Sequence, residues 1–227
     1  MDFFGLLNTL TSLEAAPRIA VTAIPMIFAI TVHEAAHGYA ARHFGDMTAH
    51  NLGRISLNPI RHIDPIGTVL IPSLTLYFGG LFFGWAKPVP VDFVKLRHPK
   101  RDMLWVAAAG PGANLVMVFL WAAIIKLAVV LPPNFALPLA LMGAAGILTN
   151  TILMVLNLIP LPPLDGGRIA LSLLPHELAV KYAKIERYGF IILITLVVVS
   201  AYYVNILGKI MNPFINATLQ LIKNIFF

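Results

Sequence analysis

Long apolar stretches separated by short polar connections run through the whole chain. Taking about 20 residues as the length of helix that crosses a bilayer, we expect spans at residues 16–41, 66–85, 103–131, 137–159 and 188–207. A weaker amphipathic stretch follows at 211–227, with Lys223 as its only charged residue. The pattern predicts an all-α polytopic membrane protein with about five to six transmembrane helices.

The connections on either side of the second apolar stretch are both basic. Residues 42–65 hold three arginines and three histidines, and residues 86–102 hold a cluster of lysines and arginines. Basic loops gather on one side of a membrane, whereas an ordinary span between these two would separate them. Either residues 66–85 are re-entrant, which is allowed where protein or water surrounds irregular backbone, or the rule fails locally. The orientation of the chain therefore stays open.

The composition supports a membrane location. The chain of 227 residues is 59% hydrophobic and 11% charged, with a mean hydropathy of +0.83, whereas a soluble domain carries about 25% charged residues. Cationic loops beside membrane spans explain the net charge of +6, so no nucleic-acid partner is expected. We expect one membrane-embedded domain over residues 1–227, a multi-pass protein of the cell membrane in contact with the lipid bilayer.

Three ionisable side chains, His33, Glu34 and His37, interrupt the first apolar stretch. Four residues of helix turn through about 400°, so the two imidazoles leave nearly the same face and can converge on one metal ion. Glu34 lies about 100° away from His33, where its carboxylate can reach a metal-bound water without being a ligand. Ionisable groups are costly in such a segment unless they serve a function.

A catalytic zinc needs three protein ligands and one open position for water. The chain has no cysteine, so the third ligand must be a histidine or a carboxylate. His43 follows His37 by six residues, but if the helix continues through Ala40, His43 points about 240° away from His37. The geometry therefore disfavours His43.

Asp165 is the better candidate for the third ligand. It follows a segment that begins inside the fourth apolar stretch, where three prolines are expected to break the helix at membrane depth. An intramembrane carboxylate is costly without a partner, and a metal ion would supply one. Gly166 and Gly167 would let the backbone turn tightly beside it. Capping of a following helix at 168–174 is a compatible role for the same residue.

Residues 85–92 combine two prolines with alternating valines, which excludes a helix interior or a central strand. The segment is either a stiff loop or an extended edge that pairs with an extended substrate. The sequence leaves these two alternatives open.

Asn114 follows a run of small residues at 107–113 near the start of the third apolar stretch. Small residues allow close helix packing, and an amide can hydrogen-bond across such a contact. We expect Asn114 to have this packing role rather than a catalytic one.

The motif of His33, Glu34 and His37, together with the downstream segment of Asn157, Pro160 and Asp165, resembles the site-2 protease family of intramembrane zinc metalloproteases. The Gly110-Pro111…Asn114 element and the segment 87–91 are also similar to that family, in its short bacterial and archaeal branch without a PDZ or CBS domain. The resemblance covers residues 16–175, leaving C-terminal helices at 176–227.

The resemblance implies one zinc ion per chain, with three ligands (His33, His37 and Asp165) and Glu34 as catalytic base. It also implies that Asn157 is a polar group near the scissile carbonyl. A β-like edge around the substrate-binding residues would receive a transmembrane protein or peptide substrate; these residues are Pro88, Val89, Pro90 and Val91. The implied activity is hydrolysis of peptide bonds in or near transmembrane segments.

Two other classes of protein compete with this interpretation. Prenyl-protein endopeptidases use a downstream glutamate as third ligand, but the downstream glutamates here, Glu177 and Glu186, lie in a charged connector. A zinc transporter or another non-proteolytic metal-binding membrane protein would need the ligands but has no use for Glu34 beside them.

Overall fold

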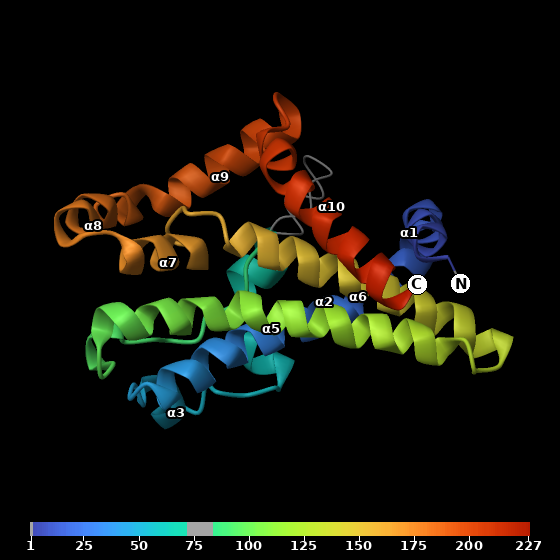
Figure 1. The fold of residues 1–227 in the computed structure, drawn as a ribbon, viewed down its shortest axis with the longest axis horizontal. Helices are drawn as coiled ribbons and strands as arrows, with labels where there is room; N and C mark the ends of the chain where they lie inside the picture. The colour runs from blue at the N-terminus through green and yellow to red at the C-terminus, as the bar shows by residue number, and fades with distance from the viewer. Residues whose placement is uncertain (1, 72–83) are drawn as a thin grey trace.

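The computed structural model describes residues 2–71 and 84–227, and this part of the chain is helical (Figure 1). The N-terminal half contains α1 (Phe3–Ser12), α2 (Ala15–His43), α3 (Thr48–Asn51), the short helices η1 (Pro59–His62), η2 (Pro65–Leu70) and η3 (Phe93–Lys95), and α5 (Pro99–Ala128). The C-terminal half contains α6 (Pro133–Asn157), α7 (Asp165–Leu173), α8 (His176–Ala183), α9 (Glu186–Tyr202) and α10 (Ile206–Phe226).

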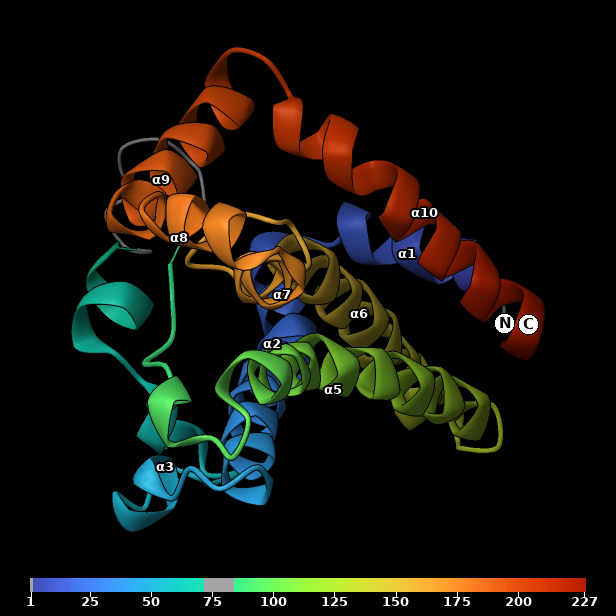
Figure 2. The same ribbon diagram turned by 60° about the vertical axis from the view of Figure 1, so that its left-hand side comes forward.

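Three long helices, α2, α5 and α6, form the centre of the fold. Both views show α5 and α6 running side by side over much of their length, with α2 against them (Figures 1 and 2). Their small residues allow this approach: a Cβ at Gly143 would collide with the Ile125 side chain and would lie 3.2 Å from the main-chain oxygen of Trp121. The central helices therefore pack closely enough for side chains of all three to meet.

Helices α1 and α10 cover one side of this centre. Phe3 of α1 is fully buried, and its ring stacks on Phe227 with 5.4 Å between centroids, so the two chain ends lie together (Figure 2). Residues of α1, α5, α6 and α10 share one apolar cluster that includes Ile125, Ile147 and Ile222. The amphipathic 211–227 stretch is therefore a packed helix, which begins earlier than expected, at Ile206.

The expected membrane spans agree with the helices in four of five places. The stretches at 16–41, 103–131, 137–159 and 188–207 correspond to α2, α5, α6 and α9. In the described part of the chain, three helices (α2, α5 and α6) are long and apolar enough to cross a membrane. The helices α8 and α9 are bent by 60° relative to each other, and if this pair forms one span the number rises to four. The chain is thus a helical membrane protein, and the expected five to six spans are not reached in these residues.

The second apolar stretch lies largely outside the described residues, because 72–83 are not among them. Its beginning forms η2, a π-helix that Asp64 caps by accepting hydrogen bonds from the N–H groups of Ile66 and Gly67. The question of whether residues 66–85 span the membrane or re-enter it therefore stays a prediction.

The β-like element is not confirmed. Residues 84–92 have no helical or strand structure, and none of the residues that the structure describes forms a strand. A physical reason lies in Pro88 and Pro90, which have no N–H and so remove two of the donors that a strand ladder needs.

The prolines after α6 break the helix as expected. Helix α6 ends at Asn157, and α7 begins at Asp165 after a non-helical connection that contains Pro160, Pro162 and Pro163. After this break, α7 packs against α5.

Candidate metal centre

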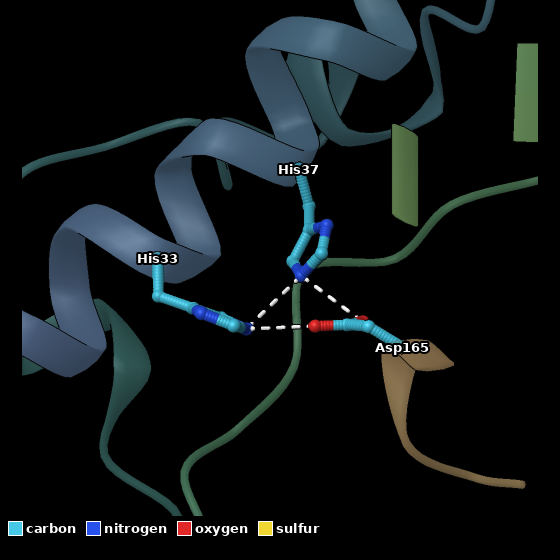
Figure 3. Close-up of side chains that lie close together, drawn as sticks. All are labelled: His33, His37 and Asp165. Carbon is cyan, nitrogen blue, oxygen red and sulfur yellow. Dashed lines mark hydrogen bonds and ion pairs between the residues drawn. The ribbon is translucent and has the colours of Figure 1, made fainter. Parts of the chain in front are cut away.

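Two elements far apart in the sequence bring three ligand-type side chains together. His33 and His37 leave one face of α2, and Asp165 reaches them from the first turn of α7 (Figure 3). The two Nε2 atoms are 3.1 Å apart, and each lies near one carboxylate oxygen of Asp165, at 3.2 Å for His33 and 3.3 Å for His37. Among the described residues, this is the one cluster of three such groups whose ligand atoms all lie within 4.8 Å.

The spacing and chemistry of these atoms fit a metal ion. Nδ1 of His37 is 2.7 Å from the carbonyl oxygen of Val106, which can only accept, so Nδ1 carries the proton and Nε2 is an acceptor in the neutral ring. Nε2 of His37 therefore faces a carboxylate oxygen, which is also an acceptor. Oδ2 of Asp165 is buried without a hydrogen-bond donor in the described structure. Two ligand atoms bound tetrahedrally to zinc at about 2.0–2.1 Å lie about 3.3–3.4 Å apart, close to the spacing of these atoms. A cation between the nitrogen and oxygen acceptors would remove their repulsion.

Gly110 of α5 lies directly beneath the two imidazoles. A Cβ on this residue would lie 2.6 Å from both Cε1 and Nε2 of His33 and would also collide with His37. The absence of a side chain therefore allows α5 to approach α2 behind the rings, which brings the Val106 carbonyl one turn away onto His37.

Gly166 and Gly167 position Asp165 by close packing rather than by a turn. Neither has a positive φ, and both are buried in the first turn of α7. A Cβ on Gly166 would collide with the carbonyl oxygens of Leu158 and Ile159, and one on Gly167 would lie 2.8 Å from Cα of Pro162. The predicted tight turn is thus wrong, because these glycines instead let α7 pack against the chain that leaves α6.

Glu34 lies beside the cluster and outside it. Its Oε2 accepts a 2.8 Å hydrogen bond from the main-chain N–H of Val89. The carboxylate therefore connects α2 to the extended segment at 88–91, the segment that the family resemblance implies to be substrate-binding.

The extended segment is held by further contacts with α2 and with the connection that follows α3. The side chain of Val89 is buried, and Gly38 leaves it room, since a Cβ there would lie 3.2 Å from Val89 Cγ1. The Arg54 guanidinium donates to the carbonyl oxygens of Lys87 and Pro88. Pro88 is exposed, and Pro90 and Val91 are half-buried.

The remaining predicted site residues lie apart from the three ligands. Asn157, the last residue of α6, is half-buried and donates to the Leu153 carbonyl oxygen at 3.0 Å; in the described structure it makes no hydrogen bond to the cluster. Helix α2 continues through Ala40 to His43, whose ring contacts Phe44 and is not part of the cluster. The argument against His43 is therefore supported.

Sequence reasoning underestimated Asn114 and missed Asn150. Oδ1 of Asn114 lies 2.6 Å from Nδ1 of His33, so this residue contacts a candidate ligand as well as linking helices. Asn150 of α6 lies behind it at 2.9 Å. The available signal was an amide inside each of these two apolar stretches, since buried polar groups in a membrane span are rarely without a role.

The fold and this cluster together fit one class of protein, the membrane-embedded metallohydrolases. The family model described as "Peptidase family M50" matches residues 135–200 of this chain. YwhC of Bacillus subtilis (strain 168), named as a predicted zinc metalloprotease, is 36% identical over 219 residues, which are 94% of this chain and 93% of the relative. Rip2 of Mycolicibacterium smegmatis, named in the same way, is 30% identical over 77% of this chain and 65% of the relative.

The chain belongs to peptidase family M50, the site-2 protease family that the sequence motifs resemble. No solved structure matches it.

Proposed function

We propose that the protein is an intramembrane zinc metalloprotease that hydrolyses peptide bonds in or near the transmembrane segments of membrane proteins. The observation that carries the proposal is the convergence of His33, His37 and Asp165 within 4.8 Å, with Glu34 next to them and outside the cluster. Family membership supports the same activity and zinc as its cofactor.

Each residue of the site has a defined part in this reaction. His33, His37 and Asp165 would hold the zinc ion, leaving one position open. Zinc, when bound, polarises a carbonyl oxygen and lowers the pKa of a water molecule. Glu34 takes the proton of the attacking water and later gives it to the leaving amine. A substrate helix conceals its carbonyls in main-chain hydrogen bonds, so it must unwind before it reaches Glu34.

The extended segment of Pro88, Val89, Pro90 and Val91 is proposed to receive the unwound substrate. Its hydrogen bond to Glu34, the proposed catalytic base, supports this role. Pro88 and Pro90 have no main-chain N–H to donate to a substrate. On the edge of the segment that these two residues form, pairing would rely on main-chain carbonyl oxygens that accept hydrogen bonds from the substrate. The segment would thus bind substrate without forming a regular strand.

Asn157 is proposed as a polar group near the scissile carbonyl. It ends α6 immediately before the connection that leads to Asp165. Its Nδ2 donates to Leu153 within its own helix, so this role requires the donor to leave Leu153 and turn to a substrate oxygen, which an amide N–H can stabilise.

For the whole chain we propose a single membrane domain over residues 1–227 in the cell membrane, with a motif-bearing core at 16–175. The bent pair α8–α9, the helix α10 and residues 66–85 are the candidates for bringing the span count to five or six. The lipid bilayer and a transmembrane protein substrate are its expected partners.

The test compares wild type with Glu34→Gln, each purified in detergent with bound zinc measured and incubated with single-span peptides that contain helix-breaking residues. Zinc in both and cleavage only by wild type is the expected result. Glu177→Gln is the matched control, because Glu177 is exposed on α8 and the same change there should leave cleavage intact. Full cleavage by Glu34→Gln would refute the assigned base.

A zinc-binding membrane transporter is the alternative function. It would retain zinc in all three proteins and cleave none of the peptides, and it would move zinc across vesicles. The position of Glu34 beside the cluster favours hydrolysis over this alternative.

A further inference from the structure

Two asparagines lie buried between the central helices. Asn114 of α5 and Asn150 of α6 have no exposed surface, and both lie within apolar helices long enough to cross a membrane. Burying an amide without hydrogen bonds is costly, so most donors and acceptors of the two side-chain amides should be hydrogen-bonded. The two amides form one continuous series of hydrogen bonds that ends on His33.

Two backbone carbonyls determine how these amides are oriented. The Gly146 carbonyl oxygen lies 2.8 Å from Asn150 and can only accept, so the Asn150 group facing it is the Nδ2 amine. Oδ1 of Asn150 then points at Asn114, 2.9 Å away, which must present its own Nδ2. The Ala29 carbonyl oxygen, at 3.3 Å, requires the same orientation of Asn114.

The orientation of Asn114 decides which nitrogen of His33 carries a proton. With Nδ2 turned to Asn150 and Ala29, Oδ1 of Asn114 faces Nδ1 of His33 at 2.6 Å. An amide oxygen can only accept, so Nδ1 of the neutral imidazole must be the donor. Nε2 is then left with its lone pair directed at His37 and Asp165.

We propose that Asn114 and Asn150 form an amide relay that fixes the Nδ1–H tautomer of His33 and so prepares its Nε2 as a metal ligand. The proposal rests on the proposed zinc site. Asn150, which makes no hydrogen bond to His37 or Asp165 in the described structure, becomes a positioning residue that acts on the site through Asn114.

The two histidines differ in how their tautomers are set. For His37 the acceptor is the main-chain carbonyl of Val106, which no substitution of Val106 removes directly. For His33 the acceptor is a side chain whose orientation depends on a second side chain. Removal of an acceptor side chain can therefore change the tautomer of His33 but not that of His37.

The first experiment measures the zinc dissociation constant of the full chain in detergent by competition with a fluorescent chelator. We expect Asn114→Leu to raise it by about 10–100-fold, the range typical of residues that orient metal-bound histidines, and Asn150→Leu to raise it by about 10-fold. Thr151→Val is the matched control. Thr151 is the neighbouring buried polar residue of α6, and its hydroxyl has no hydrogen-bond partner in the described structure.

The second experiment observes the tautomer directly. In metal-free wild type labelled with ¹⁵N-histidine, the protonated and bare ring nitrogens have distinct ¹⁵N shifts, and His33→Gln assigns the signal. We expect a single Nδ1–H form of His33 in wild type and a mixture in Asn150→Leu. This measurement on wild type alone keeps the proposal testable if the leucine variants do not fold.

The outcomes separate the relay from the metal site. A bare Nδ1 of His33 in wild type, or equal zinc affinity in Asn150→Leu and Thr151→Val, would overturn the relay while wild type still binds zinc. If His33→Gln binds zinc as tightly as wild type, His33 is not a ligand. That result would count against the metal site itself.

Discussion

The main-chain N–H of Val89 donates a 2.8 Å hydrogen bond to Oε2 of Glu34, the carboxylate that follows His33 on α2. One contact thereby joins the proposed catalytic base to the segment proposed to bind substrate. The base is held by the backbone of a segment that has no regular structure of its own, so changes in that segment should affect catalysis without affecting the metal.

Val89→Pro should separate these two effects. Proline removes the N–H that holds Glu34, and hydrogen bonds to charged groups contribute about 1.5–3 kcal/mol, so we expect peptide cleavage to fall by about 10–100-fold with zinc content unchanged. Val89→Ala is the control, since it keeps the N–H and loses only the buried side chain. Equal activity of the proline and alanine variants would show that the hydrogen bond has no part in catalysis.

Gly110→Ala should disrupt the metal centre by steric collision. Its Cβ would lie 2.6 Å from Nε2 of His33, so the rings or the α2–α5 contact must shift. We expect zinc affinity to fall by about 100-fold or more. This is at least as large as the fall of about 10–100-fold that follows mutation of a residue that orients a metal ligand. Gly112→Ala is a matched control on the same helix, because a Cβ there meets nothing within 4 Å, and it should bind zinc normally with slightly higher helix stability. Normal zinc affinity in the Gly110 variant would contradict the described packing.

Removal of zinc should destabilise the wild-type fold. The acceptor atoms of His37 and Asp165 lie 3.3 Å apart, so they repel each other once the cation between them is removed. A ligand present at about 1,000 times its dissociation constant stabilises the folded protein by about 4 kcal/mol. We expect the thermal midpoint in detergent to fall when a strong chelator is added. His37→Ala should melt at one temperature with and without chelator, and a chelator effect of the same size in that variant would place the metal elsewhere.

Asp46 should make stability depend on pH at the acidic end. It is a buried residue in the connection between α2 and α3, and it accepts hydrogen bonds from the N–H groups of Thr48 and Asp92. Burial alone raises its pKa, but the hydrogen bonds from Thr48 and Asp92, with the charge of Lys95, outweigh burial and hold the pKa below 3.8. A depressed pKa means that the stabilisation is present above pH 3.8 and is lost as the pH falls through the pKa of the folded state.

Asp46→Asn tests this dependence. The amide can accept from only one side, so we expect the variant to be less stable at pH 7 by about 1–3 kcal/mol. The gap between the thermal midpoints of wild type and variant should narrow as the pH falls below 3.8. A gap that stays constant down to the lowest pH at which both proteins fold would rule out the titration of Asp46 as its cause.

The sequence predicts the parts of this protein that follow from local pattern. Apolar length locates α2, α5, α6 and α9, and the four-residue spacing of His33 and His37 predicts their common face. Asp165 could be inferred because an acid after a helix-breaking proline segment needs a partner. Each of these conclusions depends on residues close together in the chain or on the cost of one buried charge.

The parts that could not be predicted depend on which surfaces meet. Asn150 lies 36 positions after Asn114 and its contact with it exists only because α5 and α6 pack side by side. The role of Gly110 likewise depends on the rings of another helix, and the hydrogen bond of Val89 on the approach of an irregular segment. Gly166 and Gly167 were assigned to a turn because glycine permits turns, whereas the structure uses their small size.

The three proposed ligands join positions 33 and 37, in the first long helix, to position 165, beyond the third. A metal ion held by them would act as a cross-link between distant parts of the chain, comparable to a disulfide in a protein that has no cysteine. Closing so long a loop removes conformational freedom from the unfolded chain, so the ion that enables the chemistry would also tether the C-terminal helices to the membrane core.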